Sequence, residues 1–154
     1  MEILLFSGSL RAASLNKQLV AVVKDICTTV PGLEATVMDL KTLSIPVYDG
    51  DIEEKGLPEG VQKLGAAAAK AHGLIISSPE YNGAMAGSMK NTIDWLSRLK
   101  PHPFQKKPVL LLGASPGGFG AIRSLTSSSI PFATLGAYVY PQTFALAKAH
   151  EVLK

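Results

Sequence analysis

The sequence predicts an α/β fold in which a parallel β-sheet has helices on both faces. Residues 2–6, 74–77 and 109–113 form short, almost unbroken apolar runs, which are typical of strands covered on both sides. Stretches with helical spacing alternate with these runs, and that alternation favours parallel strands joined by crossover helices. The 154 residues, 47% of them hydrophobic and 18% charged, suit one domain with a sizeable core.

Three stretches, at residues 15–30, 61–71 and 85–99, have apolar residues at every third or fourth position, as amphipathic helices do. We expect a fourth, shorter helix at residues 121–130. Proline stops the first, third and fourth at Pro31, Pro101 and Pro131, because it cannot continue a helix. Gly73 is placed to end the second. We therefore expect four main helices with these limits.

Two weaker strands and one long loop complete the pattern. Residues 35–39 and 137–140 are β-branched or aromatic enough to form strands. Residues 43–60 contain prolines, glycines and several acids, and we expect a surface loop there. It is the longest irregular connection, so it is a candidate flank of a functional site.

Charge and composition exclude several classes of function. Lys and Arg number 15 against 12 Asp and Glu, and the net charge of +3 suits anionic small molecules but is too small for a nucleic-acid surface. No apolar run approaches the roughly 20 residues of a membrane helix, and no signal peptide is visible, so we expect a cytoplasmic protein. Cys27 is alone, and His72, His102 and His150 lack ligand spacing. We expect a packed thiol, histidines at surface or cap positions, and no metal site.

Three polar loops follow the three strongest strands, at residues 7–16, 78–83 and 113–120. The carboxyl ends of parallel strands meet at one edge of a sheet, and open α/β sheets bind ligands at that edge. The sequence therefore predicts that the three loops lie together and form a binding site.

The first loop has the chemistry of a phosphate site. Gly8 permits a tight turn, while Ser9, Ser14 and Asn16 offer short hydrogen-bonding side chains. A helix begins near Ser14, so its free N–H groups and positive dipole end face the loop, and Arg11 adds a permanent charge. An equally favoured interpretation is that Ser14 only caps the helix and the preceding residues form a polar turn. The loop lacks the Gly-Lys-Ser/Thr of a nucleotide-binding P-loop.

The other two loops suit a flat heterocycle. Tyr81 offers an aromatic ring beside backbone donors, and the stretch from Ser115 to Gly118 exposes N–H groups with little side chain in the way. The alternatives are an ordinary turn with Tyr81 half-buried, and a glycine-rich turn before a helix. Three such loops on one edge favour a ligand site.

Four stretches in the same order and spacing resemble the NADPH-dependent FMN reductase family, flavodoxin-like proteins that include quinone, chromate and azo-dye reductases. The stretches are GSLRAASLN at 8–16, SPEYN at 78–82, KNTIDWLSR at 90–98 and GASPGG at 113–118. The similarity runs from residue 2 to about residue 142. It implies that residues 1–154 form a single flavodoxin-like FMN-binding domain.

The resemblance assigns residues to the cofactor in three groups. Those implied to hold the FMN phosphate are Ser9, Arg11, Ser14, Leu15 and Asn16; those along the isoalloxazine ring are Pro79, Glu80, Tyr81, Asn82 and Gly83; those at its pyrimidine end are Ser115, Pro116, Gly117 and Gly118. Hydride would pass from NADPH (or NADH) through FMN to a small acceptor: a quinone, a flavin, an azo compound or a metal oxyanion. Because the cofactor supplies the chemistry, no catalytic side chain is implied.

The same resemblance implies a three-layer sandwich with a five-stranded parallel sheet in the order 2-1-3-4-5, in homodimers or homotetramers. Family chains continue into a closing helix, whereas only residues 142–154 remain here, so that helix is shortened or missing. Leu146, His150 and Leu153 have the spacing of one short helix. Trp95 and the neighbouring methionines fit either the core or a subunit interface. Because polar residues surround Trp95, we favour an interface there.

Two other functions fit the same loops. One is a non-catalytic flavodoxin-like flavin-binding or electron-carrier domain, against which the basic charge argues, since such carriers are strongly acidic. The other is a structural α/β domain that binds a different phosphorylated ligand.

Overall fold

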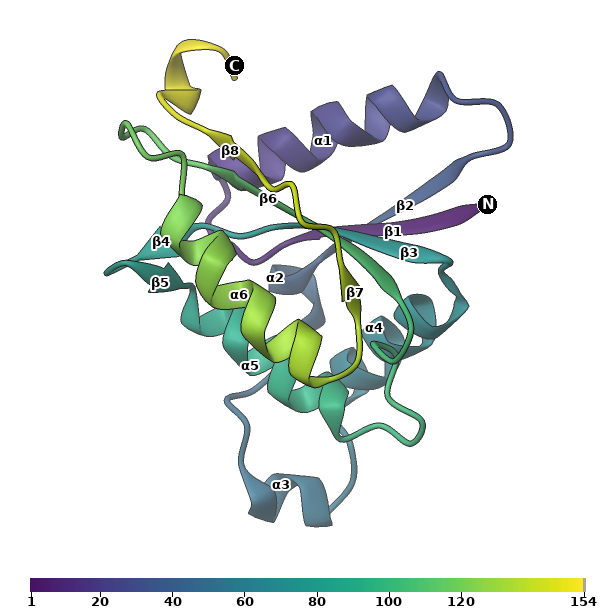
Figure 1. Ribbon diagram of the computed structural model, residues 1–154. Coiled ribbons are helices and arrows are strands. Elements are labelled where there is room, and N and C mark those ends of the chain that lie inside the picture. Colours follow the sequence, from purple (N-terminus) through teal and green to yellow (C-terminus); the bar gives the residue numbers. More distant parts are fainter. Residues whose placement is uncertain (154) are drawn as a thin grey trace.

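A computed structural model describes residues 1–153 and shows a central sheet between two helical layers (Figure 1). The strands are β1 (Glu2–Ser7), β2 (Glu34–Asp39), β3 (Gly73–Ser77), β6 (Pro108–Ala114), β7 (Tyr138–Val139) and β8 (Phe144–Leu146). They are all parallel, in the order β2-β1-β3-β6-β7, and β8 also pairs with β6. The predicted strand order and flavodoxin-like arrangement are confirmed.

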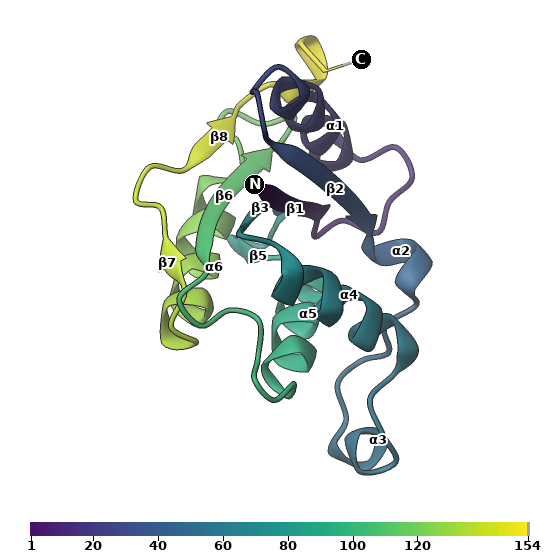
Figure 2. The same cartoon turned by 90° about the vertical axis from the view of Figure 1, so that its right-hand side faces the viewer.

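The helices are α1 (Leu15–Thr28), α2 (Leu40–Leu43), α3 (Gly50–Glu54), α4 (Glu59–Lys70), α5 (Gly87–Ser97) and α6 (Ile122–Thr134), with a 3-10 turn η1 (Ala149–Glu151). Helix α1 and η1 lie on one face of the sheet, whereas α4, α5 and α6 lie on the other (Figure 2). Within residues 1–153, none of the helices combines the length and hydrophobicity that crossing a membrane requires.

Alternation along the strands divides the core between these two layers. On β1, β3 and β6, residues such as Phe6, Ile76 and Leu111 are buried against α4, α5 and α6. Their neighbours Ile75 and Leu112 face α1 and η1 instead. This burial on both sides explains why the three strands read as continuous apolar runs.

The face beside α1 is covered only in part. A hollow of about 510 Å³ remains over the amino-terminal half of the strands, lined among others by Ile75, Leu110, Tyr138 and Tyr140. At the carboxyl half of the same strands, Ala149 is fully buried against Leu112 and Ala114. The C-terminal segment therefore packs at the end of the sheet where the predicted site lies.

Two predictions at the C-terminal side are wrong. Helix α6 does not stop at Pro131 but runs on to Thr134, because the following Phe132 is fully buried edge-on against Phe104, 5.2 Å between ring centroids, and fixes the last turn. The short helix expected near residues 146–153 is the three-residue turn η1, and β8 precedes it. β8 pairs with the second half of β6 after Pro141 interrupts the edge strand.

The expected subunit interface at Trp95 is also wrong, because Trp95 is fully buried in the core. Its indole N–H donates to the carbonyl of Pro46 at 2.8 Å, and its ring meets Tyr48 edge-on with 5.0 Å between centroids. A side chain with no exposed surface cannot contact a second subunit. Among the polar neighbours of Trp95 in the sequence, Asp94 and Ser97 are partly exposed and Arg98 is exposed.

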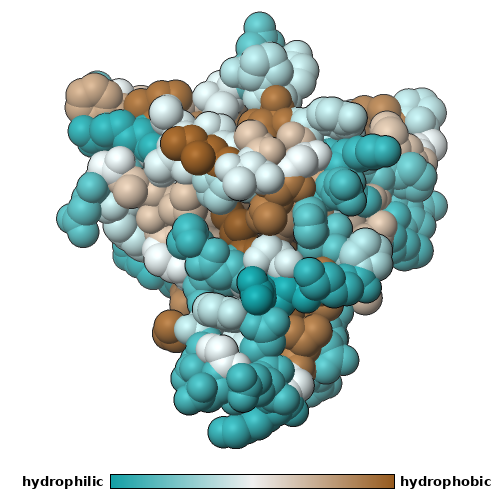
Figure 3. Space-filling view, turned by 60° about the horizontal axis from the view of Figure 1, so that its bottom comes forward, coloured by the Kyte–Doolittle hydropathy of each residue, from teal (hydrophilic) through white to brown (hydrophobic). Residues whose placement is uncertain are grey.

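The predicted loop at residues 43–60 contains α3 and is attached to α5. Asn91 accepts a hydrogen bond from the N–H of Tyr48 at 2.7 Å and donates one to Pro46 at 2.8 Å. Glu53 accepts from the Tyr48 hydroxyl at 2.7 Å and pairs with Arg98 at 3.0 Å. Figure 3 shows the protruding α3 end as mostly hydrophilic, with apolar patches nearer the middle of the molecule.

This attachment predicts a pH-dependent stability. The hydrogen bond from Tyr48, followed by that from Arg98, holds the pKa of Glu53 below its usual value. The unfolded chain then binds the proton more readily than the folded one, so the stabilisation is present at neutral pH and is lost as the pH falls through the lowered pKa. We expect the melting-temperature difference between wild type and Glu53→Gln to shrink steadily on acidification, as followed by circular dichroism. Glu54→Gln is the control, and a difference that grows in acid would contradict the prediction.

Candidate functional site

The three predicted loops lie together at the carboxyl edge of the sheet, on the left in Figure 1. They enclose a hollow of about 300 Å³, which we call the edge hollow. Its lining residues are Ser9, Arg11, Ala13, Ser14, Leu15, Asn16, Pro79, Glu80, Tyr81, Ala114, Ser115, Pro116 and His150. Most of the residues predicted for the site thus line one hollow, whereas Asn82, Gly83, Gly117 and Gly118 do not line it.

The β1–α1 loop is held by its own serines. The N–H of Ser9 donates to the Ser7 hydroxyl oxygen at 3.1 Å, and the N–H of Arg11 donates to the Ser9 hydroxyl oxygen at 3.3 Å. Ser14 is the N-cap of α1, and its hydroxyl oxygen accepts from the N–H of Lys17 at 3.4 Å. Both roles that the sequence left open for Ser14 are therefore compatible, because this capping serine also lines the edge hollow.

The first turn of α1 leaves donors available. Among the described residues, the structure records no acceptor for the N–H groups of Leu15 and Asn16, as expected at a helix N-terminus. Both residues line the edge hollow, next to the positive end of the helix dipole. The donor set here therefore fits an anionic group such as a phosphate.

Gly8 is explained by packing. A Cβ atom there would lie 2.7 Å from Met89 Cε and 3.1 Å from Met89 Cβ on α5. Its φ is outside the left-handed range, so the close approach of α5, rather than a positive φ, is what favours glycine here. The N–H of Gly8 also donates to the backbone carbonyl of Ser77 at 2.9 Å. This hydrogen bond fixes the loop to the end of β3.

Asn16 connects the ends of two strands to α1. Its side-chain N–H donates to the Ala114 carbonyl at 2.9 Å, and its oxygen accepts from the Ala114 N–H at 3.0 Å and from the Ser77 hydroxyl at 2.8 Å. Asn16 is 4% exposed. The amide is therefore engaged by the protein itself, and it holds the first loop against β3 and β6.

The second loop continues into a hairpin, β4 (Glu80–Tyr81) paired with β5 (Ala84–Met85). Asn82 and Gly83 form its two-residue turn with φ values of 53° and 76°, which is the geometry that an Asn-Gly pair favours. This turn accounts for both residues without a ligand. Tyr81 is 47% exposed at the edge hollow, so its ring is half-buried and still offers a free surface.

The third loop approaches the edge hollow with Ser115 and Pro116. A Cβ atom at Gly118 would meet nothing within 4 Å, and one at Gly117 would meet only Ser115 Oγ at 3.8 Å. Neither glycine has a positive φ. The packing of the fold therefore does not require these two glycines, and their exposed backbone remains open to a ligand.

Two cationic side chains around the site are already neutralised. Lys17 Nζ lies 2.7 Å from Asp39, and Arg123 lies 2.6 Å from Glu80, whose carboxylate also accepts from the Arg123 N–H. Burial raises the pKa of Asp39, but hydrogen bonds from Lys17 and from the N–H of Lys41 outweigh it and keep the pKa below its usual value. Asp39 is thus charged at neutral pH. Glu80 lines the hollow with its charge compensated.

The sequence reasoning placed His150 at the surface or at a cap, and the side chain is indeed exposed, but the sequence did not connect it with the site. It reaches the edge hollow because η1 folds back onto the third loop, where the N–H of Ala149 donates to Ser115 at 2.9 Å. No local pattern signals this contact, since it depends on where the edge strand ends.

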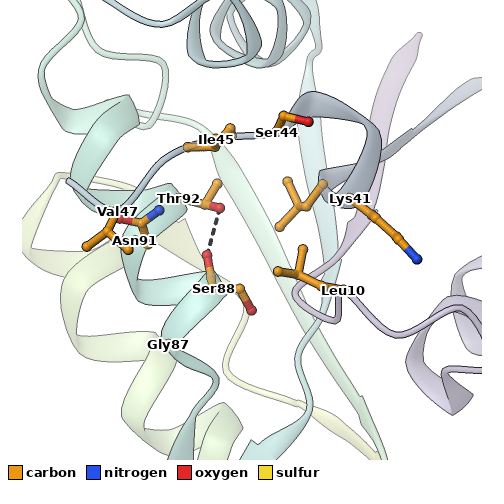
Figure 4. Close-up of a pocket in the computed structure, with 10 residues that line it drawn as sticks. Leu10, Lys41, Ser44, Ile45, Val47, Gly87, Ser88, Asn91 and Thr92 are labelled. Atoms are coloured by element: carbon orange, nitrogen blue, oxygen red, sulfur yellow. Dashed lines mark hydrogen bonds between the residues drawn. The ribbon is translucent and has the colours of Figure 1, made fainter. Parts of the chain in front are cut away.

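A second hollow of about 300 Å³ lies on the other side of Leu10 (Figure 4). Its lining is mostly apolar and comes from Leu10, Leu40, Lys41, Ser44, Ile45, Val47, Gly87, Ser88, Asn91 and Thr92. The Thr92 hydroxyl donates to the Ser88 carbonyl at 2.8 Å inside α5. The β1–α1 loop thus contributes to both hollows, and the predicted long loop lines the second one through Ser44, Ile45 and Val47.

Comparison with known proteins agrees with this geometry. Residues 1–151 match the sequence model of the NADPH-dependent FMN reductase family. The chain is 39% identical over 124 residues to an NAD(P)H-dependent FMN reductase of Pseudomonas aeruginosa, with 80% of this chain and 65% of that protein covered. It is 36% identical over 128 residues to a quinone reductase of Escherichia coli, with 80% and 64% covered.

A solved structure is similar as well. The flavoenzyme FerB of Paracoccus denitrificans, an NAD(P)H:acceptor oxidoreductase, has a TM-score of 0.80 at 28% identity, with 92% of this chain and 77% of that chain covered. The chain spans 64–65% of the length of the two curated relatives described above. The matched motifs, the sheet order and the loops at its carboxyl edge have one common explanation: the chain belongs to the NADPH-dependent FMN reductase family.

Proposed function

We propose that this chain binds FMN at the edge hollow and acts as an NAD(P)H-dependent reductase of a small acceptor. The observation on which the proposal rests is that three separate loops, the free N–H groups of α1 and the cation of Arg11 converge on one hollow. The family membership supports the same assignment. When bound, FMN supplies the redox chemistry, and the protein's part is to bind and orient it.

Each loop has a distinct proposed role. Ser9, Arg11, Ser14 and the N–H groups of Leu15 and Asn16 hold the phosphate, while the Asn16 amide positions the loop. The hairpin from Pro79 to Gly83 lies along the ring. The exposed N–H groups of Gly117 and Gly118 donate to the polar end of the ring and favour negative charge there.

Three further properties remain predictions. The acceptor is a quinone, a flavin, an azo compound or a metal oxyanion, and no residue described above selects among them. A homodimer or homotetramer and a cytoplasmic location follow from the sequence reasoning. Residues 1–154 as a single FMN-binding domain are part of the same proposal.

Flavin binding and anaerobic reduction test the proposal. The purified chain, mixed with FMN and desalted, is expected to remain yellow, and NADPH is expected to bleach the flavin absorbance in the absence of oxygen. A chain that binds FMN but is reduced negligibly slowly in stopped flow is a flavin carrier instead. A chain that neither retains nor rebinds FMN disproves the proposal altogether.

A further inference from the structure

We propose that His150 is a second cationic contact of the phosphate group, working together with Arg11. The inference rests on the proposed function, because it names a further residue of the same FMN site. It comes from the position of the C-terminal turn, which the three predicted loops do not include.

The backbone around His150 is fixed to the third loop. The N–H of Lys148 donates to the Gly117 carbonyl at 3.0 Å, and the N–H of Ala149 donates to the Ser115 carbonyl at 2.9 Å. Ala149 is fully buried, packed with Leu19 of α1 and Leu112 of β6. The turn is therefore anchored between the loop after β6 and α1, and it holds the imidazole at the edge hollow.

The charges around the edge hollow leave a role for this imidazole. Lys17 and Arg123 are paired with Asp39 and Glu80. Among the residues that line the hollow, the cationic or protonatable nitrogen side chains are Arg11 and His150, and both are free of ion pairs in the described part of the chain. A phosphate monoester carries about −1.5 to −2 charges at neutral pH. Arg11 compensates one of them, and a protonated His150 compensates most of the rest.

Histidine side chains in general gain or lose their charge between about pH 5 and 8, so a change of pH in this range can switch such a contact on or off. A bound phosphate favours the protonated imidazole, which donates charge-assisted hydrogen bonds to it. The other titratable groups on the hollow are Arg11, Glu80 and Tyr81, and Lys148 and Glu151 flank His150 on its own turn. Since Glu80 is held by Arg123, the phosphate is the anion left for His150 in the hollow.

The variant His150→Gln tests the inference through binding rather than turnover. Titrations that follow flavin fluorescence would measure the dissociation constants of FMN and of riboflavin, which lacks the phosphate. We expect FMN to bind about tenfold more weakly to the variant near pH 6, with riboflavin unaffected. The ratio of the two FMN constants is expected to fall towards one as the pH rises to about 8, because histidine side chains in general lose their charge over this range. Comparing variant with wild type at each pH cancels the ionisation of the phosphate itself.

Lys148→Gln is the matched control, because it removes a full charge from the same turn without touching the hollow. We expect it to leave FMN affinity unchanged, and both variants to melt at the wild-type temperature. An equal loss for riboflavin, a loss that does not depend on pH, or no loss in His150→Gln would overturn the inference while leaving wild-type FMN binding intact. Failure of the wild type to bind FMN overturns the proposed function itself.

Discussion

Replacing Asn16 by alanine is expected to lower the free energy of unfolding by about 3–4 kcal/mol. The substitution removes three hydrogen bonds at once, and it leaves the N–H and carbonyl of Ala114 and the Ser77 hydroxyl without their partner. All of these groups lie in the interior, where an unpaired polar group is costly. Urea unfolding of the FMN-free chain, followed by circular dichroism, measures the effect.

Ser77→Ala is the matched control for Asn16→Ala, because it removes only the hydroxyl hydrogen bond and leaves the amide bonded to Ala114. We expect a loss of about 1 kcal/mol. Equal stability of the Asn16→Ala variant and the wild type would show that the β1–α1 loop is not held in this way. The amide would then be free to serve the ligand.

The second large effect is expected on the affinity for FMN, when Arg11 is replaced. Arg11→Ala is expected to weaken FMN binding by about 1.5–3 kcal/mol, tenfold or more in the dissociation constant, because a hydrogen bond between charged groups is lost. The Arg11 side chain is exposed, and within residues 1–153 the hydrogen bond recorded for Arg11 comes from its backbone N–H. Stability should therefore not change, and fluorescence titration with FMN isolates the effect.

Two comparisons make the Arg11 result specific. Riboflavin should bind Arg11→Ala and the wild type equally, since it has no phosphate. Arg11→Lys should bind FMN with intermediate affinity, because lysine keeps the charge but loses the planar pair of donors. Unchanged FMN affinity in Arg11→Ala would place the phosphate elsewhere on the sheet edge.

The part of the fold that was predictable is the part that short sequence patterns encode. The strands β1, β3 and β6 appear as apolar runs because α4, α5 and α6 cover one face of the sheet, and α1 and the C-terminal turn cover part of the other. Helix α6 passing through Pro131 and the pairing of β8 were not predictable, because each depends on a distant partner. Phe104 holds the last turn of α6, and the end of β6 receives β8.

The sequence by itself determined the order of strands and helices, the edge at which the three loops meet, and the identity of most residues around the edge hollow. The order of the elements and their shared edge follow from hydrophobic periodicity and from the rule that parallel strands end at one edge, whereas the assignment of individual residues to the site came from the resemblance to the family. Only the tertiary structure decided which of those residues remain available to a ligand. Asn16 is held by Ala114 and Ser77, Glu80 is neutralised by Arg123, and His150 is brought in from the far end of the chain. Such partnerships join segments many residues apart, so no local pattern encodes them.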